Sequence, residues 1–107
     1  MEISEIHKKF LEALHEKRKV SVKVNSFEKG IIVRKCVPFD YGASKRYHDN
    51  SDRYHFYDLD SPEGSHNLSI LPSQLIEIAI LDESFDPKDY VKWTPDWMIK
   101  RDWGDFS

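Results

Sequence analysis

The spacing of apolar residues changes from a helical period to a strand period early in the chain, and this change restricts the fold more than any other feature. Over residues 4–18, apolar side chains recur every three or four positions, which predicts an amphipathic helix with Ser4 as its N-cap. Valines then occupy alternate positions, at Val20, Val22 and Val24, as in a strand with one buried face. We therefore expect an α+β, mainly β protein with an N-terminal helix.

Four further segments have the composition of short strands and are separated by turn residues. They are expected over residues 31–39, 54–60, 66–71 and 76–80. The segment 31–39 is apolar enough to be buried on much of both faces, and Pro38 marks its end or an edge position. Residues 40–52 are irregular and polar, and such long loops in a small domain often carry function. Five antiparallel strands after one helix predict an SH3-like or Sm-like barrel over residues 19–82.

The segment 83–107 forms a C-terminal tail of a different character. Asp86 and Thr94 each precede a proline, and both residue types cap helical turns. Short helical turns are therefore expected near residues 87–92 and 95–102.

All three tryptophans of the chain lie in this tail. Arg101 follows Trp97 by four residues, so its guanidinium can stack on the indole. The indoles either close one end of the barrel or form an interface with a partner. The candidate interface residues are Trp93, Trp97 and Trp103.

The size and composition of the chain indicate one globular domain over residues 1–107. With 39% hydrophobic and 33% charged residues, the chain can bury a core and still present a solvated surface. The single cysteine, Cys36, lies in an apolar run, which favours a buried side chain over a reactive thiol and excludes an internal disulfide framework. No signal-peptide pattern or membrane-length apolar run is present, so we expect a cytoplasmic protein without membrane contact.

Charge is distributed unevenly along the chain. Residues 1–35 carry nine Lys/Arg and five Glu, whereas residues 36–107 carry seven Lys/Arg and fourteen Asp/Glu. This asymmetry indicates either a basic face or a charge difference that the fold brings together and neutralises.

The irregular segment also contains cations interleaved with aromatic residues. Cations can bind phosphates and flat rings can stack on bases, so this pattern favours a nucleic acid or a nucleotide as ligand. Nearby aspartates favour the alternative of a solvated loop with local ion pairs. The candidate ligand-binding residues are Lys45, Arg46, Tyr47, Arg53 and Tyr54.

Catalytic and metal-binding patterns are absent from the sequence. No nucleophile–base set, phosphate-cradling glycine loop or paired-carboxylate signature can be recognised. His48 and His55 lie seven residues apart, which matches no known ligand spacing. We therefore expect a binding protein without a cofactor or metal, and not an enzyme.

The order of these features resembles the WYL domain family over roughly residues 10–86. The resemblance consists of the helix that ends before Val20, the Val37-Pro38-Phe39 step, the aromatic strand around Tyr54-His55-Phe56, and the alternating strand of residues 75–81 followed by Phe85. Gln74 occupies the position of the family's arginine before the closing strand, and the tryptophan and leucine of the naming motif are absent.

WYL domains are regarded as ligand-sensing modules that are often attached to DNA-binding domains, and nucleic acids are among their proposed ligands. The resemblance implies a stand-alone ligand-binding or regulatory module that binds nucleic acid or a nucleotide through residues 41–57. The alternative is a protein-interaction domain or homodimer that uses the tryptophan tail or an edge strand.

Overall fold

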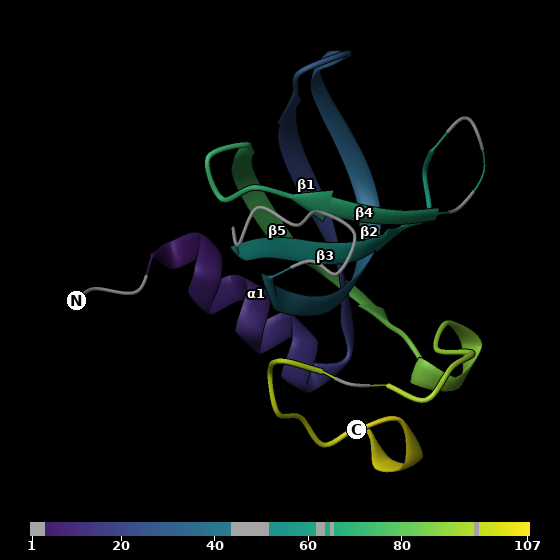
Figure 1. The fold of residues 1–107 in the computed structure, drawn as a ribbon. Helices are drawn as coiled ribbons and strands as arrows, with labels where there is room; N and C mark the ends of the chain where they lie inside the picture. Colours follow the sequence, from purple (N-terminus) through teal and green to yellow (C-terminus); the bar gives the residue numbers. More distant parts are fainter. Residues whose placement is uncertain (1–3, 44–51, 62–63, 65, 96) are drawn as a thin grey trace.

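The computed structural model describes residues 4–43, 52–61, 64, 66–95 and 97–107, and within them it contains one α-helix and one five-stranded antiparallel sheet (Figure 1). The helix α1 spans Glu5–Glu16. The strands are β1 (Arg18–Ser26), β2 (Gly30–Ala43), β3 (Asp52–Asp58), β4 (His66–Ile70) and β5 (Leu75–Ser84). The prediction of a mainly β fold with an N-terminal helix is confirmed. None of the described helical segments is long and apolar enough to cross a membrane.

Local interactions define both ends of α1. The Ser4 hydroxyl accepts a hydrogen bond from the His7 amide at 3.1 Å, as expected of an N-cap. Lys17 ends the helix in the left-handed conformation at φ 57°, and its N–H donates to the carbonyl of Ala13. Because β1 begins at the next residue, the helix is held against the sheet that follows it.

The strands are ordered β4-β3-β2-β1-β5 in the sheet. The strands β1 to β4 pair with their sequence neighbours, and β5 returns to pair with β1. The edge strands β4 and β5 are not hydrogen-bonded to each other in the described part of the chain, so the sheet is open. The five antiparallel strands are therefore confirmed, and closure into a barrel remains a prediction.

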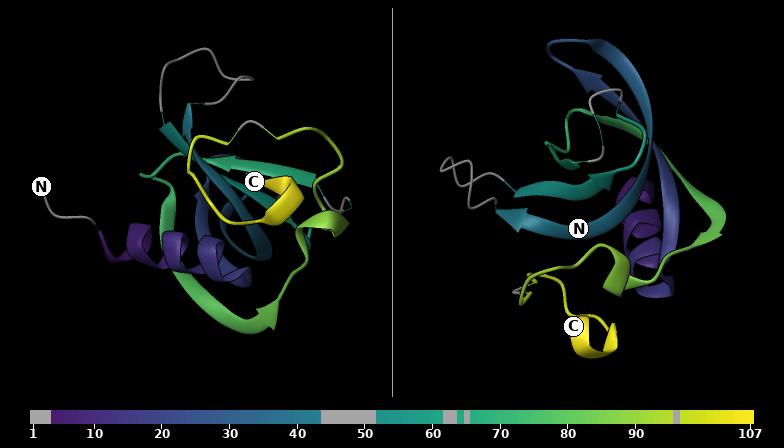
Figure 2. Two further views of the ribbon diagram at one scale, coloured as in Figure 1. Left: turned by 90° about the horizontal axis from the view of Figure 1, so that it is seen from below. Right: turned by 90° about the vertical axis from the view of Figure 1, so that its right-hand side faces the viewer.

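The prediction that a strand ends near Pro38 is wrong, because β2 continues to Ala43. Pro38 is opposite Phe56 and Asp40 is opposite His55, so Phe39 is an extra residue in β2. Such a β-bulge interrupts the ladder locally, and it is one of the places where a sheet accepts proline. The strand therefore bends and continues into the segment predicted as a loop (Figure 2).

The core lies between α1 and the concave face of the sheet. Phe10 is fully buried, and its ring centroid lies 5.0 Å from that of Tyr54 and 5.4 Å from that of Phe56. The alternating valines of β1 face the same interior, as their spacing predicts. Cys36 is also buried here, and this burial raises the pKa of its thiol.

The tail forms only short 3-10 turns, η1 (Pro87–Asp89) and η2 (Gly104–Phe106). The turn expected at residues 87–92 is present in part as η1, whose first amides are capped by Asp86. The helical turn expected over residues 95–102 is wrong for the described residues of that range. The Met98 and Ile99 amides bond to Asp40 of β2, so they do not take part in a helix.

Candidate functional site

The structure describes two of the five predicted ligand-binding residues. Lys45, Arg46 and Tyr47 lie in residues 44–51, outside the described residues. Arg53 and Tyr54 lie on β3, next to that segment, and are 9% and 4% exposed. Their side chains therefore belong mainly to the interior, and ligand binding by the five residues remains a prediction.

Tyr54 is part of an aromatic cluster with His7 of α1 and Tyr41 of β2. The Tyr54 hydroxyl lies 2.8 Å from His7 Nδ1, and the Tyr41 ring centroid lies 4.6 Å from that of Tyr54 and 4.9 Å from that of His7. Burial raises the pKa of Tyr54 to about 12, so its hydroxyl is protonated at neutral pH and can donate to Nδ1. His7 and Tyr41 are half-buried, and Tyr41 lies near the end of β2.

Sequence reasoning missed the contribution of His7. It precedes Phe10 by three residues, and this helical spacing places it on the buried face of α1. The spacing could have identified a histidine that faces the sheet, although it could not identify Tyr54 as its partner.

His55 links three strands through both ring nitrogens. Nε2 lies 3.0 Å from the carbonyl oxygen of Gly42, which can only accept, so this nitrogen carries a proton. Nδ1 lies 2.9 Å from the Ser69 hydroxyl. Among the side chains that the structure describes, no group of three or more His, Cys, Asp or Glu is arranged to hold a metal ion.

The three predicted interface tryptophans have different environments. Trp103 is 3% exposed and donates from Nε1 to the carbonyl of Leu14 at 2.9 Å. Trp97 is half-buried and donates from Nε1 to the carbonyl of Phe106 at 2.7 Å. Trp93 is 47% exposed and is the one available to a partner. The tail thus uses two indoles for its own packing, and an interface at Trp93 remains a prediction.

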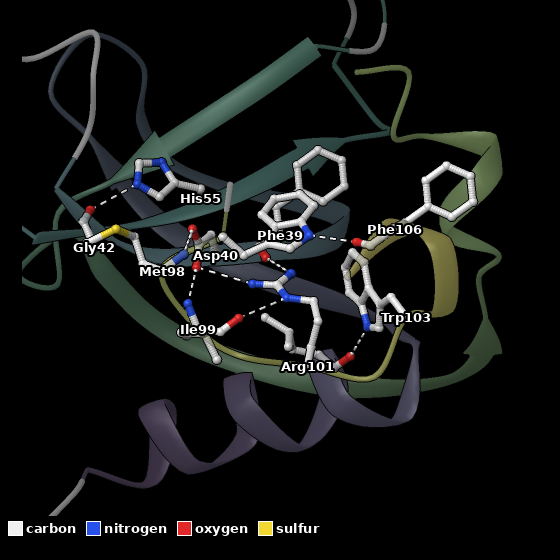
Figure 3. A network of polar contacts seen from close by, with 11 residues as sticks. Phe39, Asp40, Gly42, His55, Met98, Ile99, Arg101, Trp103 and Phe106 are labelled. Atoms are coloured by element: carbon white, nitrogen blue, oxygen red, sulfur yellow. Dashed lines mark hydrogen bonds and ion pairs between the residues drawn. The ribbon is translucent and has the colours of Figure 1, made fainter. Parts of the chain in front are cut away.

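Arg101 and Asp40 fasten the tail to the bulge in β2 (Figure 3). Arg101 Nη1 donates to the carbonyl of Phe39, the bulged residue, and Nη2 donates to the Asp40 carboxylate at 3.2 Å. The same carboxylate accepts the Met98 amide at 2.8 Å and the Ile99 amide at 3.0 Å. The Arg101 side chain is fully buried, and this burial lowers its pKa to about 10.

The guanidinium of Arg101 also stacks on indoles, as its spacing from Trp97 predicts. Its Cζ lies 4.1 Å from the centroid of Trp97 and 4.5 Å from that of Trp103. Every group of this network satisfies another group of the same network. We therefore interpret it as a structural clamp, which leaves no group directed at an external ligand.

A group of exposed apolar side chains lies around the β1–β2 hairpin. We call it the hairpin patch, and its members are Phe27, Ile31, Val33 and Ile76, which are 79%, 62%, 57% and 44% exposed. The hairpin extends beyond the other strands in Figures 1 and 2. The expectation that the segment 31–39 is buried on much of both faces is confirmed for residues 36–39, whereas Ile31 and Val33 are exposed.

Among the residues that the structure describes, none forms a ladder along the outer backbone edge of the same part of β2. Residues 30–34, which we call the β2 edge, pair with β1 on one side, whereas pairing with β3 begins only at Cys36. The last contacts on the β3 side are made by Lys35, whose carbonyl accepts from Leu59 and whose amide donates to Asp60, both at 2.9 Å.

Backbone groups of alternate residues in a strand point to the same side. Because Lys35 points toward β3, the N–H and C=O groups of Ile31 and Val33 point to the open side. The Val33 carbonyl has a contact of 3.4 Å with the guanidinium of Arg34, which is at the outer limit of a hydrogen bond. The β2 edge therefore offers main-chain donors and acceptors next to exposed β-branched side chains.

Comparison with known proteins adds no family to these geometric observations. The chain matches no protein-family model, no curated protein and no solved structure. The resemblance to WYL domains stays a prediction from the sequence, and so does the ligand binding that it implies.

Proposed function

We propose that this chain is a small β-rich interaction module that binds a protein strand along the β2 edge. The observation that carries the proposal is the coincidence of open backbone groups and exposed apolar side chains at Ile31 and Val33. An open strand edge is a template for pairing with another chain, and folded proteins commonly protect it with charges, proline or a covering segment. Main-chain pairing at such an edge is a recurrent mode of peptide recognition.

The hairpin patch supports the same function. Phe27, Ile31 and Val33 lie on one projecting hairpin and Ile76 lies on the neighbouring β5, and none of them belongs to the buried core. Groups of exposed apolar side chains mark interaction sites on many proteins. A paired strand would place its own side chains beside Ile31 and Val33, where β-branched residues contact each other well.

Backbone amide signals can test this function with a defined probe. A short peptide of alternating valine and threonine, titrated into dilute labelled protein, is expected to shift the Ile31 and Val33 amides and to slow their hydrogen exchange. Val33→Pro removes one donor of the β2 edge at a position where a strand tolerates proline, so it should abolish both effects. Peptide binding that shifts other amides only, or that persists in Val33→Pro, contradicts the proposal.

A second candidate function is ligand binding through residues 41–57, as in a WYL-like module with an SH3-like or Sm-like barrel. The half-buried rings of His7 and Tyr41 favour it, because Tyr41 belongs to this range and its ring centroid lies 4.9 Å from that of His7. The return of β5 to β1 is compatible with a barrel, and the buried thiol of Cys36 is compatible with a cytoplasmic location.

Titration with single-stranded oligonucleotides tests this second candidate. Binding should weaken as the salt concentration rises, because phosphate contacts release counterions. Tyr41→Ala should reduce binding at every salt concentration by removing a stacking surface. The absence of binding at low salt would exclude nucleic acid as the ligand.

A further inference from the structure

The strand that best fits the β2 edge is the β2 edge of a second copy of this chain. We infer that two copies pair antiparallel along residues 30–34, about a two-fold axis that passes near Ile32. This inference rests on the proposed function, since it names the partner of the same edge. A two-fold axis perpendicular to a sheet relates two edge strands in antiparallel orientation, so the same surface serves both subunits.

The direction of the backbone groups selects the register. Ile31 and Val33 are the residues of the β2 edge whose N–H and C=O groups point outward. When Ile31 lies opposite Val33 of the partner subunit, each of the two symmetric pairs exchanges both of its hydrogen bonds, as hydrogen-bonded antiparallel pairs do. A register with Ile31 on the axis would leave Val33 opposite Lys29, which lies in the hairpin turn and continues no strand.

The side chains agree with this register. Ile31 and Val33 are exposed on the same face of β2, and directly opposed residues of an antiparallel pair share a face. Two copies would therefore place isoleucine beside valine twice. The two hairpin patches would then form one continuous apolar surface across the joined sheets.

The charges around the β2 edge favour a copy of the chain over a strongly charged peptide. Lys35 is held by Glu83 at 2.7 Å, and Arg34 lies 3.5 Å from Asp58. Lys23, which is opposite Val33 on one side, is opposite Glu77 of β5 on the other. These cations have carboxylates of their own subunit beside them, so they select weakly for an acidic partner.

The same neutralisation permits self-pairing. The proposed contact ends at residue 34, because Leu59 and Asp60 of the same subunit already occupy the β3 side of Lys35. Lys35 therefore borders the contact and does not pair across it, and Glu83 accompanies this lysine. The charged groups at each end of the contact thus include a carboxylate as well as cations.

Sedimentation measurements over a wide protein concentration range test the inference. The natural chain should show a reversible monomer–dimer equilibrium, and Val33→Pro should weaken dimerisation at least about tenfold, which corresponds to about 1.4 kcal/mol. Val33→Thr is the matched control, because it keeps the amide and the β-branched shape and should dimerise nearly as well as the natural chain. A Val33→Pro protein that fails to fold is replaced by the double variant Ile31→Lys, Val33→Lys, which places lysines opposite each other across the axis.

Hydrogen exchange assigns the contact. Protection of the Ile31 and Val33 amides should rise with protein concentration in the natural chain, and protection of the Ile31 amide should not rise in Val33→Pro. A dimer that is insensitive to both the proline and the double-lysine variants, or a chain that stays monomeric at every concentration, overturns the inference. The valine–threonine peptide separates the two proposals. If it still protects these amides in a chain that stays monomeric, strand binding at the β2 edge stands and only pairing with a second copy fails. If it does not protect them, strand binding and self-pairing both fail.

Discussion

The clamp between Asp40 and Arg101 provides a sharp test of how the tail is held. We predict that Asp40→Ala detaches the tail from β2 and strongly lowers the free energy of unfolding. The substitution removes the acceptor of three hydrogen bonds, from the Met98 and Ile99 amides and from Arg101. It also leaves the guanidinium of Arg101 without its carboxylate at a site where that side chain has no exposed surface.

The expected magnitude follows from the burial of this pair. Removal of one partner of a buried ion pair costs about 3–5 kcal/mol, because the remaining charge is left without compensation. The two part-buried amides that lose their acceptor add to this cost, up to about 1–3 kcal/mol each. Detachment of the tail rehydrates these groups and limits the sum, so we expect a loss of about 4 kcal/mol. Domains of this size are stable by only about 5–15 kcal/mol, so the effect is large.

The position of the tryptophans makes the assay selective. All three lie in the tail, so their fluorescence reports the tail, whereas far-ultraviolet circular dichroism reports the sheet. In Asp40→Ala, acrylamide should quench Trp97 and Trp103 more strongly, and urea should unfold the protein at a lower concentration. Asp82→Ala is the matched control, because it removes another arginine–aspartate contact of 2.9 Å whose carboxylate is fully exposed. The reasoning is refuted if the two variants have the same urea midpoint and the same quenching.

Three further predictions concern the core. Phe10→Ala should lower the free energy of unfolding by about 3–5 kcal/mol in urea titrations, because it opens a cavity beside Tyr54 and Phe56, and a loss below about 1 kcal/mol would contradict the packing. The phenol of Tyr54 should ionise with a pKa of about 12, above that of an unfolded tyrosine near about 10. The stabilisation from the protonated phenol of Tyr54 is therefore complete below about pH 10 and is lost as the pH rises toward 12. The free energy of unfolding of Tyr54→Phe, measured across this range, should not show that loss. Cys36 should resist a thiol reagent in the native protein and react only in denaturant, because burial raises its thiol pKa and blocks access, so fast native labelling would show that the site is open.

The sequence is sufficient to predict the elements whose neighbours are local or repetitive. The helix follows from apolar spacing and from Ser4, which caps it as expected. The strand β1 follows from alternating valines, since alternation needs only one buried face. The expected stacking of Arg101 on Trp97 is present, but the segment is not helical, so the contact does not arise from helical spacing.

Features that depend on distant partners could not be predicted in this way. Thr94 and Pro95 favour a helical turn, but the amides that would continue it bond to Asp40, which lies more than fifty residues earlier. Pro38 favours a strand end, but a bulge absorbs it and the carbonyl of Phe39 bonds to Arg101 of the tail. In both places a tertiary contact overrides a local preference.

The open β2 edge at the candidate site also could not be predicted from the sequence. Ile31 and Val33 have the alternation of a buried strand face, and the sequence does not tell how far the neighbouring strand extends. In the structure β2 has 14 residues and β3 has 7, so part of β2 necessarily extends beyond its neighbour. The open backbone of the β2 edge is thus a consequence of unequal strand lengths, which no single segment reveals.

This exposure leads to a prediction that separates folding from function. Ile31 and Val33 are mostly exposed, so replacing both by lysine removes little buried area from the monomer. Under conditions where the chain is monomeric, the double-lysine variant should keep its free energy of unfolding within about 0.5 kcal/mol of the natural value, as surface substitutions usually do. Urea titration at low protein concentration measures this, with Val22→Lys on the buried face of β1 as the contrasting variant, which should unfold the domain. If the double-lysine variant is as damaging as Val22→Lys, the two residues serve the fold, and their exposure needs no partner to explain it.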